Sequence, residues 1–343
     1  MRVALLGTMA PFVYGGAELL VDSLASKLSE YGHEVEKVNL PFEWEPWEKA
    51  LESALAFRLL NIQGADKLIA FKFPAYCVKH DNLSIWLLHQ FRQVYDLWGT
   101  EYGPPQTSET FLLKESITAL DTAALSGRTI YTNSKTVSNR LIKHNGIHST
   151  VLYPPLPDEE IFSCTEYGNY IFYPSRVNHS KRQHLAVEAI KHTKSEVNLI
   201  IAGKGDSKAD EDLLIRTIEN LGIGDRVIYI NRYISQEEKA DFYSRALGVI
   251  YIPYDEDSYG YVTLEAFQSR KPVISCTDSG GTDVVVIDKE TGYMTESTPE
   301  ALGGAMDIMY NDKGNAKNMG EAGYELIGKL GISWDNVITR LLS

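Results

Sequence analysis

The sequence predicts an α/β protein of two domains, each built on a parallel sheet covered by helices. Two stretches, 2–144 and 170–252, alternate short apolar runs typical of buried strands with amphipathic runs typical of helices. Between them, residues 152–157 spell LYPPLP, and three prolines in six residues break regular structure. A length of 343 residues suits two domains of ordinary size.

The charge of the chain excludes several classes of partner. Net charge is −13; residues 1–155 carry 14 basic and 16 acidic residues, and the remainder carries 19 and 30. An acidic chain without a basic run is a poor nucleic-acid binder and is weakly attracted to anionic lipid. The near-neutral first half leaves room for a lipid-linked acceptor at the inner membrane.

Cysteine usage indicates a reducing compartment. Cys77, Cys164 and Cys276 are odd in number, far apart and without C-x-x-C spacing, which argues against a disulfide framework or a zinc site. No apolar run is long enough for a transmembrane segment. The opening MRVALLGT is better explained as a buried strand than as a signal peptide. We therefore expect a cytoplasmic protein.

In the first domain, strands are predicted at 2–7, 33–40, 67–71, 85–89 and 128–132, and helices from 17 to near 32, up to 60, over 109–125 and up to about 144. Gly15 and Gly16 stand just before the first helix, where paired glycines let backbone approach a ligand. The loop is either a phosphate- or sugar-facing loop or a flexible turn. G-x-G-x-x-G is missing after the first strand, which disfavours a dinucleotide site.

Two further features of the first domain are candidates for ligand contact. His89 ends an apolar run and so lies at the carboxyl end of a strand, where ligands of open α/β sheets bind. Its alternative is a histidine satisfied by a backbone carbonyl. Trp44, Trp47 and the loop 91–108 offer a candidate acceptor surface, although core packing explains aromatic side chains equally well.

The second domain continues the alternation. Strands are predicted at 170–174, 197–202, 226–230, 248–252 and 273–275, and helices at 181–193, 208–221 and 235–246. The final stretch, 334–342, is amphipathic. We expect an N-terminal domain over 1–155, a C-terminal domain over 156–330, and a terminal helix within 331–343 that packs back on the first domain. Ligands favour the interface of two such domains.

The most informative stretch of the second domain is 255–266, DEDSYGYVTLEA. Asp257 and Glu265 are eight positions apart, with the turn Tyr259-Gly260-Tyr261 between them and a helical pattern from Val262. A helix N-terminus has free N–H groups and binds phosphate. Carboxylates beside it can accept hydrogen bonds from sugar hydroxyls, so the stretch suits a nucleotide sugar. The alternative is an ordinary helix start with acidic residues.

Three more loops of the second domain follow predicted strands. Arg176 and Lys181 stand five positions apart and can hold one anion, arginine as a fork and lysine as a point charge. Two cations near a diphosphate would neutralise charge that grows on a leaving group; the alternative is two solvated basic residues. Gly203-Lys204-Gly205 and Gly280-Gly281 are tight loops with backbone donors.

In order and spacing, these motifs resemble the retaining GT-B glycosyltransferases of family 4. The shared pattern comprises Gly15-Gly16, Arg176 and Lys181, Gly203 and Gly205, Asp257 and Glu265 around an aromatic-Gly turn, Leu264-Glu265-Ala266, Pro272-Val273 and Gly280-Gly281. The resemblance covers nearly the whole chain and is loosest over 41–125. It implies the GT-B fold, two Rossmann-like α/β/α domains facing each other across a cleft.

The resemblance also implies roles for individual residues. Arg176 and Lys181 would hold the donor diphosphate, Glu265 the ribose, and His89 would face the donor sugar. Arg232, Tyr233 and Ile234 would frame the base. Around the sugar and phosphates would lie Asp257, Ser258, Tyr259, Gly260, Tyr261 and Val262. Further donor-binding positions are Gly15, Gly16, Gly203 and Gly205. Asp257 departs from the family, whose first carboxylate is usually glutamate. Asp255-Glu256-Asp257 looks like the metal-binding Asp-x-Asp of the other large glycosyltransferase fold, but we expect no required metal and no cofactor.

The predicted reaction transfers a hexose, with retention, from a nucleoside-diphosphate sugar to an acceptor hydroxyl. UDP is favoured as the nucleotide and UDP-glucose as the donor. The acceptor would be a carbohydrate or lipid-linked glycan in polysaccharide or glycoconjugate synthesis. The alternatives are a nucleotide-sugar 2-epimerase and a non-catalytic nucleotide-sugar binding protein, the latter suggested by Asp257. A nicotinamide dehydrogenase is disfavoured by the missing glycine fingerprint.

Overall fold

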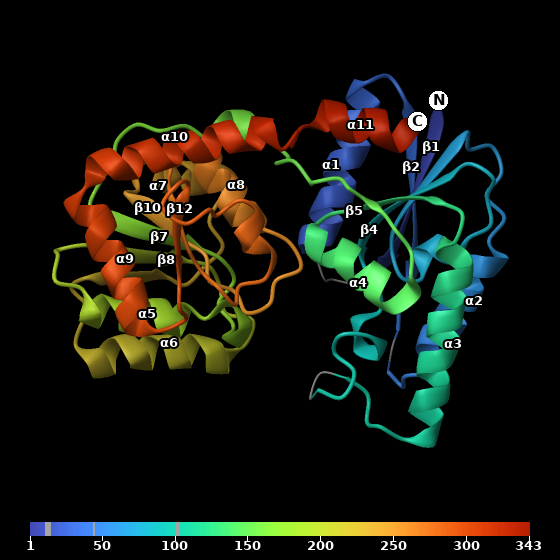
Figure 1. Cartoon of the computed structure of the whole chain (residues 1–343), viewed down its shortest axis with the longest axis horizontal. Helices are drawn as coiled ribbons and strands as arrows, with labels where there is room; N and C mark the ends of the chain where they lie inside the picture. The colour runs from blue at the N-terminus through green and yellow to red at the C-terminus, as the bar shows by residue number, and fades with distance from the viewer. Residues whose placement is uncertain (11–14, 44, 101–102) are drawn as a thin grey trace. The chain divides into compact units, whose positions relative to one another are not determined.

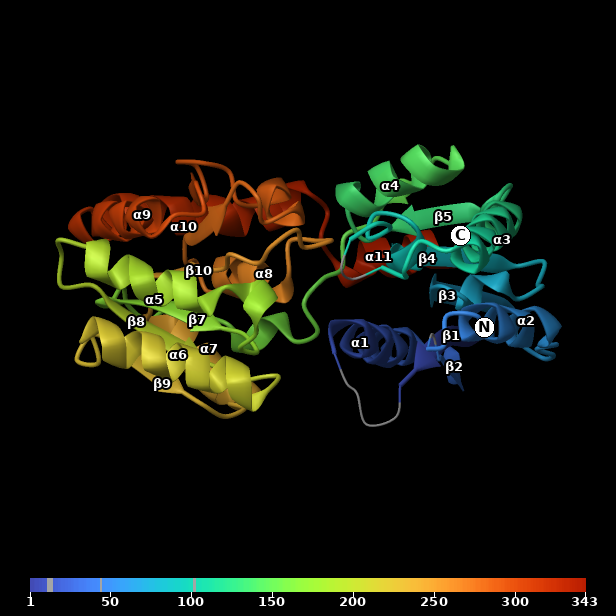
Figure 2. The same ribbon diagram turned by 90° about the horizontal axis from the view of Figure 1, so that it is seen from below.

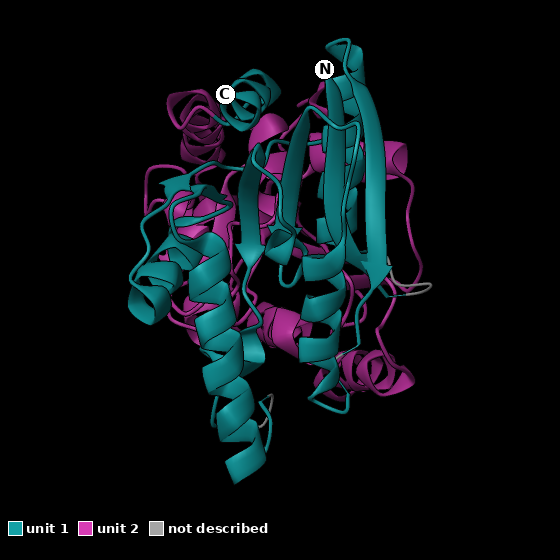
Figure 3. Cartoon of the chain, turned by 90° about the vertical axis from the view of Figure 1, so that its right-hand side faces the viewer, with its two compact units in different colours: residues 1–157, 332–343 teal, residues 158–331 magenta. Residues whose placement is uncertain are grey.

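The computed structural model describes residues 1–10, 15–43, 45–100 and 103–343, and the chain divides into two compact units. Unit 1 comprises Met1–Pro157 and Ile332–Ser343, and unit 2 comprises Asp158–Gly331 (Figure 3). The division falls at the proline-rich stretch, and the chain returns to unit 1 for its last helix. Within the described residues, no helix is both long and apolar enough to cross a membrane.

Unit 1 is built on a six-stranded parallel sheet (Figure 1). Its strands are β1 (Arg2–Met9), β2 (Glu34–Pro41), β3 (Lys67–Lys72), β4 (Leu83–His89), β5 (Thr129–Thr132) and β6 (Thr150–Val151), in the order β2-β1-β3-β4-β5-β6. Its helices are α1 (Gly16–Glu30), α2 (Lys49–Leu59), α3 (Ser108–Leu125), α4 (Lys135–Asn145) and α11 (Trp334–Leu342), with short 3-10 turns η1 (Ala75–Cys77) and η2 (Arg92–Val94).

The inner strands β1, β3 and β4 are mostly apolar on both faces because helices cover both faces of the sheet, whereas the edge strand β2 is largely exposed. Along β1, Val3 and Leu5 join the cluster that α1 and α11 cover, and Ala4 and Leu6 join the cluster that α2, α3 and α4 cover. Within α11, Val337, Ile338 and Leu341 are buried in the first cluster, and the Trp334 indole N–H donates to the Leu156 carbonyl at 2.8 Å. The final helix therefore completes one face of unit 1.

Unit 2 repeats the architecture with a second six-stranded parallel sheet. Its strands are β7 (Tyr170–Pro174), β8 (Asn198–Ala202), β9 (Val227–Ile230), β10 (Gly248–Ile250), β11 (Val273–Cys276) and β12 (Gly292–Thr295), in the order β12-β11-β10-β7-β8-β9. Its helices are α5 (Gln183–His192), α6 (Lys208–Leu221), α7 (Gln236–Arg245), α8 (Tyr261–Gln268), α9 (Pro299–Asn311) and α10 (Lys313–Lys329), with 3-10 turns η3 (Glu159–Ile161), η4 (His179–Lys181) and η5 (Gly281–Val284). Helix α5 packs beside α6 and α9, and α8 beside α7 and α10 (Figures 1 and 2).

One predicted boundary is wrong where it matters. Lys181 does not begin a helix: it ends the 3-10 turn η4, and α5 starts at Gln183. Between them, Arg182 adopts a left-handed conformation with φ 57°, which breaks the helical path. The Asn178 side chain accepts from Lys181 N and caps the short turn instead. This break turns Lys181 away from a helix face and into the loop.

Each sheet has a point at which the strand order reverses. In unit 1 the chain moves from β1 to β2 and then crosses back to β3, so β1 and β3 are neighbours. In unit 2 it moves from β7 through β8 to β9 and then crosses back to β10, so β7 and β10 are neighbours. Connections leave in opposite directions at such a point and open a crevice at the carboxyl ends, where ligands of α/β sheets bind.

Candidate functional site

The loop after β7 is held against the loop after β8 by backbone contacts. Ser175 N donates to Ala202 O at 3.1 Å, and Val177 N donates to Lys204 O at 3.0 Å. Gly203 has φ 157°, and a Cβ there would lie 1.9 Å from Ser175 O. At Gly205 a Cβ would lie 2.3 Å from Cγ of Glu211. Both glycines thus have packing reasons within the chain, and their donor-binding role stays a prediction.

Arg176 lies two residues beyond β7 and pairs with an acidic residue of the neighbouring loop. Its Nη1 lies 3.0 Å from Oδ1 of Asp206, whose other oxygen accepts from Asn178 Nδ2 at 2.8 Å. The Arg176 side chain is 55% exposed. A guanidinium so exposed can leave Asp206 for an incoming anion at little cost, because an exposed ion pair contributes little.

The Lys181 side chain spans the switch point of unit 2, the place between β7 and β10 where the strand order reverses. From the loop after β7, its Nζ reaches the loop after β10, where it pairs with Glu256 Oε2 and donates to the Tyr251 hydroxyl at 3.0 Å. The lysine side chain is 15% exposed, and Tyr251 is buried. Burial and the nearby Glu256 carboxylate hold the pKa of Tyr251 well above its usual range, so its hydroxyl stays protonated. The structure thus places a partly buried ammonium at the reversal of the sheet.

The structure gives Arg176 and Lys181 separate carboxylate partners. Arg176 pairs with Asp206 and Lys181 with Glu256, although both cations leave the same loop. Their joint action on one anion therefore requires that both carboxylates give way. The Asp255-Glu256-Asp257 run has its central side chain committed to Lys181, and within the described residues no three His, Cys, Asp or Glu side chains form a group that could hold a metal.

Backbone hydrogen bonds also join the loop between β10 and α8 to the loop between β11 and η5. Asp255 N donates to Asp278 O at 3.0 Å, and Gly281 N donates to Glu256 O at 2.9 Å. Gly280 has φ 68°, and a Cβ there would lie 2.3 Å from Glu256 O. The glycine pair that the sequence predicted to offer backbone donors thus serves the chain itself at these atoms.

Arg182 fastens this pair of loops to the lysine. Its guanidinium donates to both carboxylate oxygens of Asp278 at 2.8 Å, and its Nε donates to the Ile252 carbonyl at 2.7 Å. The arginine side chain is 12% exposed. This bidentate pair lies one residue from Lys181, so it fixes the backbone from which the lysine side chain extends.

Helix α8 begins at the same edge of the sheet. Gly260 is its N-cap, with φ 72°, and a Cβ there would lie 2.6 Å from the Tyr251 ring. Thr263 N donates to Gly260 O, while the earlier N–H groups of a helix have no partner within it. Asp257 and Ser258 in the preceding loop are partly exposed, and Tyr259 is buried. The predicted helix start after the aromatic-Gly turn is confirmed.

Glu265 lies on the second turn of α8 and is buried. One carboxylate oxygen pairs with Lys239 of α7, and the other accepts from the Tyr243 hydroxyl at 2.9 Å. The side chain is 7% exposed. Carboxylate oxygens accept more than one hydrogen bond each, so this fixed group retains capacity for ligand hydroxyls.

The predicted base-framing segment follows β9 at the edge of the sheet. Arg232 forks to Glu238 of α7, with Nη1 at 2.8 Å from Oε2, and its side chain is 57% exposed. Tyr233 is 71% exposed. These contacts hold the arginine against α7. Its contact with a base, like that of Ile234, stays a prediction.

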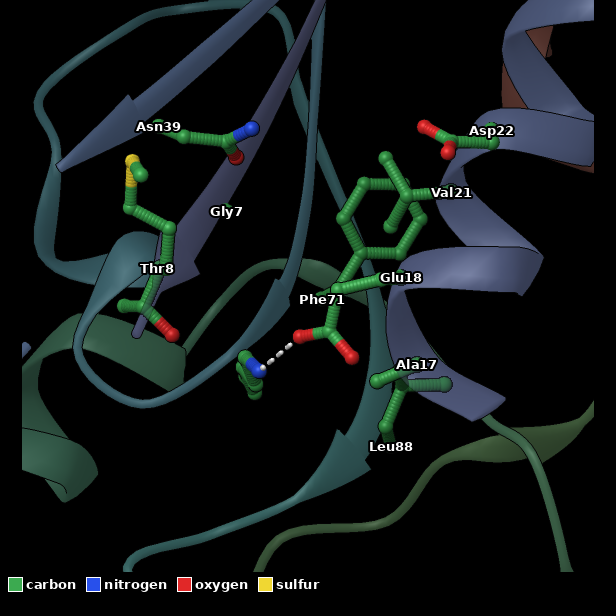
Figure 4. Close-up of a pocket in the computed structure, with 11 residues that line it drawn as sticks. Gly7, Thr8, Ala17, Glu18, Val21, Asp22, Asn39, Phe71 and Leu88 are labelled. Atoms are coloured by element: carbon green, nitrogen blue, oxygen red, sulfur yellow. Dashed lines mark hydrogen bonds and ion pairs between the residues drawn. The ribbon is translucent and has the colours of Figure 1, made fainter. Parts of the chain in front are cut away.

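In unit 1 a pocket lies at the reversal between β1 and β3. It is lined by Gly7, Thr8, Met9, Ala17, Glu18, Val21, Asp22, Asn39, Phe71, Lys72 and Leu88 (Figure 4). Glu18 reaches from α1 toward the strand ends, and its Oε1 lies 3.2 Å from Lys72 Nζ. Its other oxygen accepts from Gly15 N at 3.0 Å, so the glycine pair lies at this pocket's helix. Part of the predicted loop, 11–14, lies outside the described residues.

His89 ends β4, as the sequence predicts, and its side chain is partly exposed. Its Nδ1 lies 2.8 Å from the Gln90 carbonyl, a local contact that orients the ring. The backbone-carbonyl alternative is thus present at one ring nitrogen. A role toward a donor sugar stays a prediction.

The candidate acceptor aromatics pack within unit 1. Trp47 lies against the Phe91 ring, with centroids 6.4 Å apart, and is partly buried on the core. Lys114 Nζ lies 4.6 Å from the centroid of Trp98, within the predicted loop. Trp44 lies outside the described residues. Core packing accounts for Trp47, as its alternative stated.

Several residues at the unit 2 site were not singled out from the sequence for it: Tyr251, Arg182, Asp278, Asp206, Lys239, Tyr243 and, as a lysine partner, Glu256. Tyr251 lies within the apolar run 248–252, where an aromatic residue is indistinguishable from core. Arg182 adjoins the predicted Lys181, and Asp278 precedes the predicted glycine pair. Adjacency to a candidate was the available signal, and only folding brings 182 and 278 together.

Comparison with known proteins places this site in a recognised domain. Residues 159–326 match the family model described as Glycosyl transferases group 1. A D-inositol 3-phosphate glycosyltransferase from Xylanimonas cellulosilytica is 26% identical over 210 residues, which cover 57% of this chain and 48% of that protein. The chain thus spans about half the length of this curated relative. Unit 2 carries a Glycosyl transferases group 1 domain.

Solved structures show the same fold over the whole chain. Sucrose-phosphate synthase from Thermosynechococcus elongatus superimposes with a TM-score of 0.77 at 18% identity, covering 99% of this chain and 97% of that one. Anabaena HepE in complex with UDP gives 0.73 at 16% identity, covering 99% of each chain; HepE is also known in complex with UDP-glucose. The predicted two-domain α/β fold, that of GT-B glycosyltransferases, is confirmed.

Proposed function

We propose that this chain is a retaining glycosyltransferase of family 4 that moves a hexose from a UDP-sugar, UDP-glucose first, to an acceptor hydroxyl. The observation that carries the proposal is the ammonium of Lys181 at the switch point of unit 2, beside the α8 N-terminus and within a Glycosyl transferases group 1 domain. A cation and a helix N-terminus at one edge of the sheet suit a diphosphate, because the helix dipole favours negative charge there. The complexes of HepE with UDP and UDP-glucose support the choice of donor.

In the proposed complex, the donor diphosphate replaces the two carboxylates that now occupy the cations. Arg176 leaves Asp206, and Lys181 leaves Glu256, so that both contact the diphosphate. Lys181 keeps its Tyr251 contact, which holds the ammonium in place while the negative charge of the leaving group grows. Glu265, fixed by Lys239 and Tyr243, accepts from the ribose hydroxyls. Asp257 accepts from a sugar hydroxyl.

The chemistry then follows from positioning rather than from a covalent enzyme intermediate. The transition state resembles an oxocarbenium ion, as in glycoside hydrolysis. The acceptor hydroxyl attacks the anomeric carbon on the face from which the diphosphate departs, and the departing phosphate oxygen takes the hydroxyl proton. His89 would orient the sugar. The protein's share is orientation and charge stabilisation, with no required metal or cofactor.

The acceptor is proposed as a carbohydrate or lipid-linked glycan in polysaccharide or glycoconjugate synthesis. A cytoplasmic site of action is likewise a proposal, supported by the unpaired state of Cys77, Cys164 and Cys276. The shorter side chain of Asp257, where the family usually has glutamate, favours one other candidate: a protein that binds the donor and does not transfer it.

The decisive experiment is calorimetric titration with UDP, GDP, ADP and NAD, each with magnesium and with EDTA. We expect UDP to bind equally in both conditions, and Arg176→Ala to weaken it. Binding of NAD alone, or nucleotide binding that EDTA abolishes, would overturn the proposed site. Donor turnover then separates the activities: transfer needs an acceptor, an epimerase converts donor alone, and a binding protein does neither.

A further inference from the structure

A thiol and an amine are in contact near the C-terminal end of α8. Lys271 Nζ lies 3.1 Å from Sγ of Cys164, two side chains that are 107 positions apart in the sequence. Lys271 is fully buried, with 0% exposure, and Cys164 is partly exposed. A buried amine therefore contacts a thiol that solvent can reach.

Backbone contacts from both segments hold this pair together. Lys271 N donates to Ala266 O at 2.8 Å, which fixes the residue at the end of α8. From the other side, the Lys271 Nζ donates to the Glu166 carbonyl and lies 4.1 Å from the centroid of the Tyr167 ring. The Tyr167 hydroxyl in turn donates to the Arg270 carbonyl. The two reactive atoms are thus held at contact distance by structure on each side.

The surroundings of Lys271 favour its neutral, reactive form. The described contacts of the Lys271 amine are a carbonyl, an aromatic ring and the thiol, and burial lowers the pKa of this lysine. A lower pKa makes the neutral, nucleophilic amine more accessible. The thiolate is the form of a cysteine that reacts with oxidants.

The other two cysteines provide an internal contrast. Cys77 and Cys276 are 0% and 1% exposed. Burial raises the pKa of Cys276 to about 11 and that of Cys77 still further. The described contacts of Cys276 Sγ are Thr295 and Glu296 oxygens at 3.9 Å. Neither thiol shares the combination of solvent access and a bonded amine.

We propose that Cys164 and Lys271 form an oxidant-sensitive pair that a peroxide joins through a covalent sulfur–nitrogen bond. In the first step the Cys164 thiolate attacks hydrogen peroxide, forming an S–O bond as the O–O bond breaks. Sulfur is oxidised to the sulfenic acid, and the departing hydroxide takes up the proton that the thiol had released and becomes water. In the second step the neutral Lys271 amine attacks the sulfenyl sulfur, the S–O bond breaks, and water leaves with the amine proton.

The resulting link would join segment 164–167 to the start of β11, and it would be reversible. An added thiol attacks the sulfur, releases the lysine amine and leaves a mixed disulfide, which a second thiol reduces. A partly exposed site with a contacting amine is thus protected from the irreversible sulfinic and sulfonic acids. This proposal does not depend on the transferase reaction.

The test treats the folded full-length Cys276→Ala chain with hydrogen peroxide, digests it and measures the peptides by mass spectrometry. The Cys276→Ala background is needed because a disulfide from Cys164 to Cys276 would have the same mass change and an adjacent location. We expect the Cys164 peptide joined to the Lys271 peptide, lighter than their sum by two hydrogen atoms, and released by dithiothreitol.

Two controls make the result decisive. Cys164→Ser should abolish the linked peptide pair while the chain stays folded. Urea-unfolded chain should be oxidised at Cys164 without the link, because the amine is no longer held at the sulfur; this arm avoids any folding defect of a Lys271→Met variant. A folded chain whose Cys164 is oxidised or unchanged without the link, or equal linking in urea, overturns the proposal.

Discussion

Both units place a lysine–glutamate pair at the reversal of their sheet, but they hold it differently. In unit 1, Lys72 Nζ lies 3.2 Å from Glu18, with side chains 18% and 29% exposed, and both residues line a pocket together with Phe71, Val21 and Leu88. In unit 2, Lys181 pairs with Glu256 and also bonds the buried Tyr251 hydroxyl. A reversal of the strand order thus brings opposite charges together in each unit, although the two sheets differ in strand order.

The difference lies in the surrounding loops. Unit 2 adds the Arg182–Asp278 fork and the close backbone contacts at Gly203 and Gly280. These contacts pin four loops to one another, so the lysine extends from a fixed backbone. A sheet reversal supplies a place for a ligand, and the clamps around it supply the precision that a reaction needs.

The largest expected effect comes from removing the unit 2 lysine. Lys181→Ala should lower the transfer rate by about 100-fold, the usual loss when one donor to a developing anion is removed. Lys72→Ala, the matched change in unit 1, should lower it by less than about tenfold because that pair lacks the clamps. Steady-state kinetics with saturating donor measures both, and an equal loss would remove the proposed distinction.

The next largest effect is expected where the loop after β8 packs against the loop after β7 in unit 2. Gly203→Ala should destabilise the chain by about 2–3 kcal/mol, because it combines a left-handed φ with a Cβ 1.9 Å from the Ser175 carbonyl oxygen. Gly16→Ala is the control: nothing lies within 4 Å of a Cβ there, so stability should change by less than about 1 kcal/mol. Urea unfolding decides, and equal midpoints would contradict the packing account.

The third expected effect is a pH dependence of stability that arises in unit 1. Asp121 in unit 1 is fully buried and accepts from Tyr76 and Tyr95 at 2.9 and 2.7 Å, and burial raises its pKa to about 7. At a pH between the usual pKa of an aspartate and about 7, the Asp121 carboxyl is therefore protonated in the folded state and ionised in the unfolded state. Stability falls as pH rises from 5 to 8, by about 2 kcal/mol from this group.

Asp121→Asn tests this because an amide does not titrate. Urea unfolding at pH 5 and pH 8 should show that the variant's stability changes less with pH than that of the unsubstituted chain. The control Asp81→Asn alters an exposed aspartate of the same unit and should leave the pH dependence intact. Parallel pH profiles for Asp121→Asn and the unsubstituted chain would contradict the account.

The smallest expected effect concerns Asp278. The Arg182 guanidinium, against some opposing desolvation, holds the pKa of this carboxyl below its usual range. Its contribution is therefore present above the unfolded pKa and is lost as pH falls through the lower folded value. Since the carboxylate is 37% exposed, Asp278→Asn should cost about 1 kcal/mol or less at pH 7. The difference from the unsubstituted chain should vanish near pH 3 in urea titrations.

Much of the fold follows from the sequence alone. Alternating apolar and amphipathic runs predict β1 through β5 and β7 through β11, since a strand covered on both faces must be apolar throughout. The prolines at 154–157 mark the division. The carboxyl-end positions of His89 and Arg176, and the helix start after Gly260, follow from the same patterns. Patterns did not identify α9, α10 or β12. The strand β12 is short and half-buried.

The partners of the site residues were decided by the tertiary structure. Spacing predicts that Lys181 and Arg176 lie near an anion, but it does not show that Glu256 and Asp206 occupy them. The left-handed Arg182 separates Lys181 from α5, although periodicity starts the helix at 181, and its fork to Asp278 is a contact that periodicity does not reveal. Periodicity reports contacts along one element. Ion pairs between loops, and the meeting of Cys164 with Lys271, depend on how parallel strands bring distant residues to one edge.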